Sequence, residues 1–132
     1  MTSNTVAREK PVKRDMDLVR MILKEVADAP PDMMPIMVEF EGEFDSPTVN
    51  EHVDMLIKAG YLEGKVLNGN GGRVVDAVIF RLTWQGQDFL DAASEKVWAA
   101  AKENILKPGV SFTMDLLLSW MKQEAKSRLG LP

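Results

Sequence analysis

The chain has 132 residues, of which 45% are hydrophobic and 27% charged, as is usual for one soluble globular domain. It contains no cysteine, which excludes disulfides and thiolate chemistry, and it has no apolar run approaching the roughly 20 residues that cross a membrane. The formal net charge of −4 is spread unevenly, because residues 25–54 hold nine acids and no Lys or Arg. The first residues also lack the apolar core of a secretory signal. We therefore expect a cytoplasmic protein.

The first third of the chain predicts an arm, a helix and a short strand. Residues 1–12 are polar and without periodicity, which is typical of a disordered arm. From Lys13 onward apolar residues recur at helical spacing, and Pro30-Pro31 predicts the end of this helix. Apolar side chains at every second position from Ile36 to Phe40 predict a short strand with one polar face.

The middle third predicts a helix followed by a hairpin. Ser46-Pro47 is typical of a helix start, with Ser46 as the N-cap, and Gly60 is expected to end that helix. Residues 61–67 and 74–82 read as two strands. The glycine-rich loop between them favours a hairpin turn over a phosphate cradle, because it lacks the Lys-Ser/Thr ending of a P-loop.

The last third predicts three helices, with N-caps at Thr83, Ser94 and Ser111. Large aromatic side chains in the first two of these helices are expected to pin them to the first helix of the chain. The aromatic residues predicted to lie in the core are Trp84, Phe89 and Trp98.

A helix that turns at a glycine directly into a hairpin is how winged-helix domains present their helix and wing. We therefore predict an α+β fold. Residues 13–93 form a winged-helix-like domain of helix, short strand, helix and two-stranded wing, and residues 94–132 form a C-terminal helical extension packed on the same domain. Most winged helices have one more helix before the recognition helix, whereas residues 30–45 predict loop and strand. This difference weakens the analogy with DNA-reading proteins.

Three segments, residues 13–20, 49–62 and 82–93, together with Trp98, resemble a family of short phage and prophage proteins known only as a domain of unknown function. The resemblance spans roughly residues 13–125. It implies a bacterial or phage origin and a winged-helix-like fold. It implies no activity, so no functional residue is carried over from it.

The single histidine, His52, offers little chemistry. A catalytic or metal role would need partners, but Glu51 and Asp54 point away from its face of the helix by about 100° or more. A structural, hydrogen-bonding role is therefore favoured for His52. No G-x-S-x-G motif is present either, so we expect no enzymatic activity and no cofactor.

The alternating glutamates after Ile36 could bind Mg²⁺ together with Asp45, as nuclease carboxylates do. No suitably placed Lys or His accompanies them, so a solvated face or a surface for a basic partner is favoured. We predict that a protein partner, such as a host factor, binds this acidic side. The predicted protein-interaction residues are Glu39, Glu41, Glu43, Asp45, Glu51 and Asp54.

The alternative function is a DNA-binding regulator. The second helix is poorly suited to base reading, because no Lys or Arg occurs from residue 25 to residue 57. DNA contact would then fall to the basic arm and wing. The predicted nucleic-acid residues are Arg8, Lys10, Lys13, Arg14, Lys65, Arg73 and Arg81.

The last helix has apolar residues on more than one face. A stripe at positions 112, 116, 117, 120 and 121 suits the domain core, which leaves Met114 and Leu118 on a neighbouring face. Leftover apolar surface often marks an interface, so Met114 and Leu118 are predicted to lie in a homodimer contact. The other possibility is that neighbouring helices of the same chain cover them.

Overall fold

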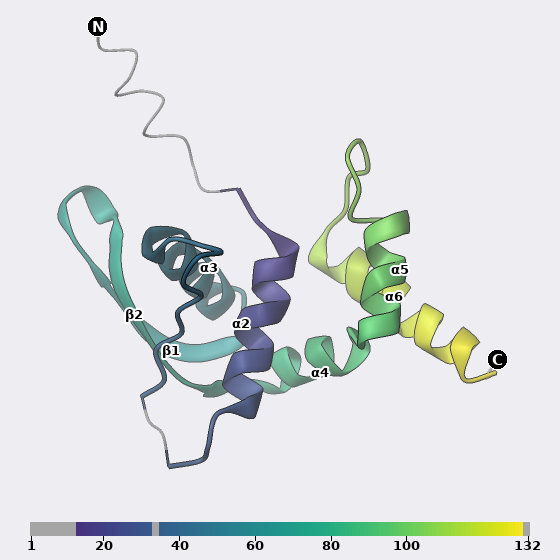
Figure 1. Ribbon diagram of the computed structural model, residues 1–132, viewed down its shortest axis with the longest axis horizontal. Helices are drawn as coiled ribbons and strands as arrows, with labels where there is room; N and C mark the ends of the chain where they lie inside the picture. Colours follow the sequence, from purple (N-terminus) through teal and green to yellow (C-terminus); the bar gives the residue numbers. More distant parts are fainter. Residues whose placement is uncertain (1–12, 33–34, 131–132) are drawn as a thin grey trace, which may run out of the picture.

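The computed structural model describes residues 13–32 and 35–130, and the predicted arm with Arg8 and Lys10 lies outside this range. The fold is mixed α+β, as predicted, with a two-stranded antiparallel sheet (Figure 1). The elements of the described residues are α2 (Met16–Asp28), α3 (Ser46–Lys58), β1 (Leu62–Asn68), the 3₁₀ turn η1 (Asn70–Gly72), β2 (Val74–Leu82), α4 (Trp84–Ala92), α5 (Glu95–Asn104) and α6 (Met114–Arg128).

Helix α2 is the central helix of the core. Asp15 is its N-cap and accepts a hydrogen bond from the Leu18 amide at 3.2 Å, and the chain turns extended at Ala29, before Pro30. The apolar spacing that predicted this helix also predicted its inward face correctly. The buried residues of α2 are Met16, Leu18, Val19, Ile22, Leu23 and Val26.

The predicted strand at residues 36–40 is wrong except for one residue. Ile36 exchanges two backbone hydrogen bonds of 2.8 Å with Ile79 at the free edge of β2, and then the chain leaves the sheet. Val38 is nevertheless buried and Phe40 is half-buried. The alternation of side chains therefore reflects packing against the core, which needs no ladder of backbone bonds.

The N-cap of helix α3 lies one residue earlier than predicted. Asp45, and not Ser46, is the N-cap, because the Asp45 carboxylate accepts the Thr48 amide at 2.8 Å. Pro47 lies in the first turn, where a missing amide hydrogen costs nothing. The helix gives way at Gly60, which has a φ of 88° that a residue with a side chain rarely adopts.

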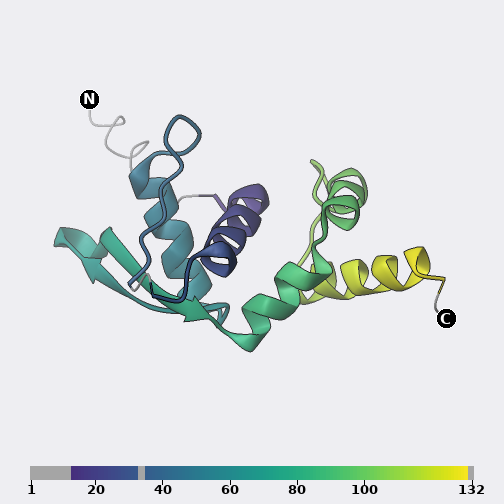
Figure 2. The same cartoon turned by 60° about the horizontal axis from the view of Figure 1, so that its bottom comes forward.

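The hairpin after Gly60 matches the prediction. β1 pairs with β2 in an antiparallel register that runs from Leu62↔Leu82 to Asn68↔Val74, with two irregularities. Helix α3 packs on both strands, and α2 contacts β2, α3 and α4. Figure 2 shows α2 and α3 together over the sheet, while α4 leads away from it toward α5 and α6.

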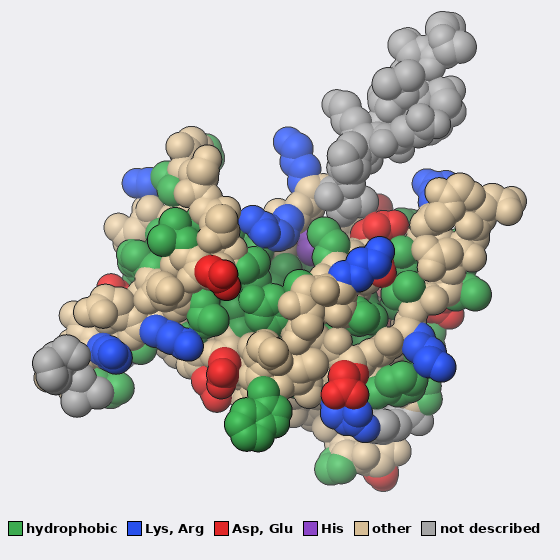
Figure 3. Space-filling view, turned by 180° about the vertical axis from the view of Figure 1, so that it is seen from behind, with side chains coloured by type: hydrophobic (Ala, Val, Ile, Leu, Met, Phe, Trp, Pro, Cys, Tyr) green, Lys and Arg blue, Asp and Glu red, His purple; other side chains and the backbone are tan. Residues whose placement is uncertain are grey.

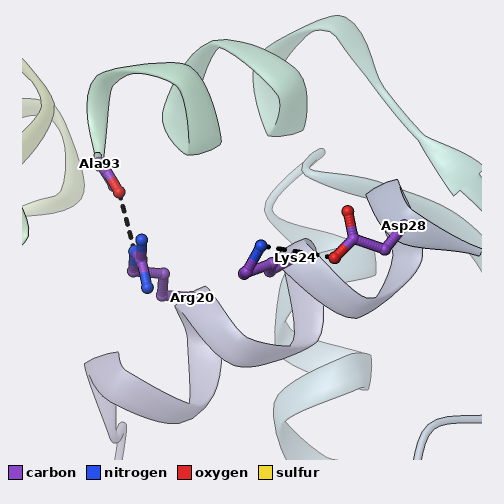
Figure 4. A network of polar contacts seen from close by, with 4 residues as sticks. All are labelled: Arg20, Lys24, Asp28 and Ala93. Atoms are coloured by element: carbon purple, nitrogen blue, oxygen red, sulfur yellow. Dashed lines mark hydrogen bonds and ion pairs between the residues drawn. The ribbon is translucent and has the colours of Figure 1, made fainter. Parts of the chain in front are cut away.

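The C-terminal helices form a second layer that is tied to α2. The predicted caps of α4 and α5, Thr83 and Ser94, are confirmed, whereas α6 is capped by Thr113 and not by Ser111. Helix α6 packs on α5 and α4. Arg20 of α2 donates to the Ala93 carbonyl oxygen at 2.8 Å, at the junction of α4 and α5 (Figure 4).

Two of the three predicted core aromatics are confirmed. Phe89 and Trp98 are buried, and their rings meet edge to face with centroids 6.1 Å apart. Trp84 was expected in the core but is 89% exposed. The reason is that Gly86 and Phe89, three residues apart, form the inward face of α4, and Trp84 lies about 200° around the helix from Gly86.

The buried face of helix α6 is shifted from the predicted stripe, away from Leu116 and toward Leu118. Leu117 and Met121 are fully buried as expected, but Leu116, predicted for the core, is 53% exposed. Met114 and Leu118 are half-buried against the core. The buried face of this helix depends on which neighbours cover it, because apolar residues in its first half lie on more than one side.

Candidate functional site

The acidic segment, residues 39–43, lies in the irregular chain between Val38 and helix α3. The Phe40 carbonyl oxygen accepts the amides of Glu43 and Phe44, both at 3.1 Å, and this turn presents the flanking side chains outward. Glu39, Glu41 and Glu43 are exposed. None of these three carboxylates forms an ion pair with any of the described residues. The segment therefore carries concentrated negative charge that nothing in the described fold neutralises.

Of the other three predicted acidic residues, Asp45 and Asp54 are bonded within the fold. Asp45 caps α3, and the hydrogen bonds from Thr48 lower the pKa of its carboxyl below the usual value of 3.8. Glu51 is half-buried. Asp54, predicted as a protein-interaction residue, is instead buried and accepts a hydrogen bond from the Lys58 ammonium at 2.9 Å. Glu39, Glu41 and Glu43 are therefore the fully exposed carboxylates of the predicted set that no bond within the described fold engages.

His52 is fully buried, which agrees with the structural role predicted for it. The Asp15 amide donates to Nε2 at 2.8 Å, so Nε2 is an acceptor, and Nδ1, 2.9 Å from the Thr48 carbonyl oxygen, carries the ring hydrogen. The ring therefore links the start of α2 to α3. Within the described part of the chain, no three His, Asp or Glu side chains gather closely enough to hold a metal ion.

The predicted nucleic-acid residues are dispersed. Lys13 and Arg14 are exposed just before α2, while Lys65 and Arg73 are exposed on the hairpin. Arg81 is ion-paired with Glu63 across the strands, so its charge is already balanced. Positive and negative side chains are interspersed on the face shown in Figure 3. The view shows no broad basic patch on that face.

One feature of the structure has no counterpart among the sequence predictions. A hollow of about 400 Å³, which we call the α2 hollow, lies where the start of α2 meets the end of α5 and the chain before α6. Its lining includes Lys13, Arg14, Asp17, Lys102, Lys107 and Phe112. These residues come from three segments up to about a hundred positions apart, so no local motif could have revealed the hollow.

None of the helices in residues 13–32 and 35–130 is long and apolar enough to cross a membrane. Comparison with known proteins gives a family but no activity. A protein of Haemophilus influenzae with the description "Uncharacterized protein" is 30% identical over 117 residues, which are 88% of this chain and 94% of that protein. No solved structure matches the chain. The profile of the family described as "Hypothetical protein (DUF2513)" matches residues 13–111, and the chain belongs to this family.

Proposed function

We propose that this chain is a non-enzymatic interaction protein of phage or prophage origin that acts in the bacterial cytoplasm and binds a basic surface of a partner protein through the acidic segment. We further propose that the fold is winged-helix-like, with α3 as the helix and β1–β2 as the wing. The order α2, Ile36 bridge, α3 and hairpin supports that reading. The bacterial source of the similar protein supports the proposed host.

The observation that carries the proposal is the exposure of Glu39, Glu41 and Glu43 without an ion-pair partner among the described residues. Three carboxylates within five residues repel one another, and a cationic partner relieves that repulsion on binding. Charge of this kind steers association and is screened by salt, which makes the proposal testable.

The test compares two variants of equal charge as baits in bacterial lysate. Glu39→Gln/Glu41→Gln/Glu43→Gln neutralises the acidic segment. The matched control, Asp88→Asn/Asp91→Asn/Glu103→Gln, neutralises three exposed acids on α4 and α5. We expect the parent and the control to retain a protein that the first variant loses, and that protein to elute as NaCl rises from about 0.05 M to about 0.5 M. Equal capture by all three baits would show that the acidic segment is not the binding site.

DNA binding by the wing is the second candidate, because Lys65 and Arg73 are exposed and form no ion pair with any described residue. In gel-shift assays, Lys65→Glu/Arg73→Glu is expected to abolish binding to duplex DNA, and the parent's affinity is expected to fall steeply with salt. Substitution of Asn50 and Glu51 by Ala is expected to leave that affinity unchanged. If this change removed a sequence preference, α3 would be the reading helix.

A homodimer through the C-terminal helices is part of the proposal. Leu118→Asp tests the face that was predicted to lie in the interface, and Leu116→Asp is the matched control on the other side of α6. Analytical ultracentrifugation is expected to show a dimer for the parent and for Leu116→Asp, and a folded monomer for Leu118→Asp. A parent protein that stays monomeric at high micromolar concentration would refute the dimer.

A further inference from the structure

The lining of the α2 hollow has an excess of positive charge. Its lining carries four cations, Lys13, Arg14, Lys102 and Lys107, against the two carboxylates of Asp15 and Asp17. The protein as a whole has a net charge of −4, so this excess runs against the overall balance. A concave site whose lining has an excess of one sign of charge raises the local concentration of ligands of the opposite sign.

Both carboxylates of the hollow are already occupied by bonds within the fold. Asp15 accepts the Leu18 amide at 3.2 Å. Asp17 accepts the indole Nε1–H of Trp98 at 2.7 Å, and its other oxygen lies 3.1 Å from the Lys102 ammonium. Lys102 and Asp17 therefore balance each other.

Three cations of the hollow have no ion-pair partner in the described part of the chain, and the only carboxylate of the lining left to offset them is that of Asp15, which its amide hydrogen bond leaves charged. Lys13, Arg14 and Lys107 are without an ion-pair partner among the described residues. The Arg14 guanidinium lies 4.9 Å from the centroid of the Phe112 ring, a cation–π contact that restrains the guanidinium without neutralising it. The Arg14 guanidinium and the ammonium groups of Lys13 and Lys107 are therefore available to bind an anion.

We propose that the α2 hollow binds the terminal phosphate groups of a small, nucleotide-sized ligand, with Lys13, Arg14 and Lys107 as the anion-binding residues. Guanidinium groups form paired hydrogen bonds with phosphate oxygens, and lysines supply additional point charges. A volume of about 400 Å³ exceeds what one phosphate group fills and falls within the usual range of small-molecule sites. The proposal is independent of the acidic segment, which lies on another part of the chain.

Isothermal titration calorimetry with the full-length chain tests the site, with EDTA present so that no divalent cation masks the phosphates. The probes are inorganic triphosphate, adenosine triphosphate and adenosine. We expect both triphosphates to bind and adenosine not to bind. Lys13→Gln/Lys107→Gln is expected to raise the Kd for the triphosphates about 10- to 100-fold, the effect of losing hydrogen bonds to a charged group.

The matched control is Lys96→Gln/Lys122→Gln, which removes the same charge from exposed positions on α5 and α6 outside the hollow. It is expected to keep the parent's Kd, and unchanged urea midpoints are expected to show that both variants fold. Equal loss in both variants would reduce the effect to net charge and overturn the site. Absence of triphosphate binding at millimolar concentration, or equal binding of adenosine, would also overturn it. Displacement of the triphosphates by a short DNA duplex at a lower phosphate concentration would contradict a small ligand.

Discussion

Trp98 holds the C-terminal layer onto α2, and its removal provides a quantitative test of this packing. The side chain is buried, meets Phe89 edge to face, and donates its indole hydrogen to Asp17 at 2.7 Å. Trp98→Ala removes the ring, the aromatic contact and the hydrogen bond together. The expected loss in the free energy of unfolding is about 3–5 kcal/mol, the range for a large aromatic that leaves a cavity.

The assay is urea denaturation followed by circular dichroism. With an m value of about 2 kcal/mol/M, a loss of this size lowers the urea midpoint by about 1.5–2.5 M. Trp84→Ala is the matched control, because it deletes the same side chain at a position that is 89% exposed. Its expected effect is within about 0.5 kcal/mol.

Trp98→Phe keeps the test decisive if the alanine variant does not fold. The ring and most of the packing stay, while the hydrogen bond to Asp17 is lost. Because the Asp17 side chain is 48% exposed, water can replace the lost donor, so the cost is expected at about 1–2 kcal/mol. Equal midpoints for Trp98→Ala and Trp84→Ala would refute the burial of Trp98 and its contacts with Phe89 and Asp17.

The remaining predictions concern α4, His52 and Asp17. Gly86→Ala is expected to lower the free energy of unfolding, measured by urea denaturation, by about 1–3 kcal/mol, because a Cβ at Gly86 would lie 2.1 Å from the Tyr61 carbonyl oxygen. Gln85→Ala is the control, and equal stability of the two variants would contradict this close approach. His52→Ala is expected to cost about 2–4 kcal/mol, since it leaves the Asp15 amide without its acceptor and opens a cavity, whereas Gln123→Ala on the exposed side of α6 is expected to cost almost nothing. Burial alone would raise the pKa of Asp17, but hydrogen bonds from Trp98 and Lys102 outweigh it and lower that pKa below 3.8. The hydrogen bonds to ionised Asp17 therefore stabilise the fold above about pH 4, and this stability is lost as pH falls through the lowered pKa. The difference in urea midpoint between the parent and Trp98→Phe is accordingly expected to narrow below about pH 4. A difference that does not change with pH would argue against the hydrogen bond from Trp98 to Asp17.

The positions and ends of most elements could be predicted from the sequence, because local interactions determine them. The caps Thr83 and Ser94 bond to amides three residues ahead, and the glycine at position 60 permits the backbone that ends α3. The apolar spacing of α2 likewise predicted its buried face. These features need only a few neighbouring residues, and all of those residues are visible in the sequence.

Local rules failed where two adjacent residues could both serve as the N-cap and where a strand needed a pairing partner. Asp45 and Ser46 are both good N-caps, and the structure selects Asp45 through its bond to Thr48. The chain after Ile36 has the alternation of a strand, yet only Ile36 pairs with β2. Backbone pairing needs a partner at the right distance, which side-chain alternation does not specify.

Only the tertiary structure determined which side chains face inward and which come together. Trp84 is exposed because Gly86 must approach the Tyr61 carbonyl, and Leu116 is exposed because α4 and α5 cover the other side of α6. The α2 hollow exists because the start of α2 and the end of α5 meet the chain before α6. Each of these outcomes depends on contacts between residues far apart in the chain, and no local pattern of polar and apolar residues specifies such contacts.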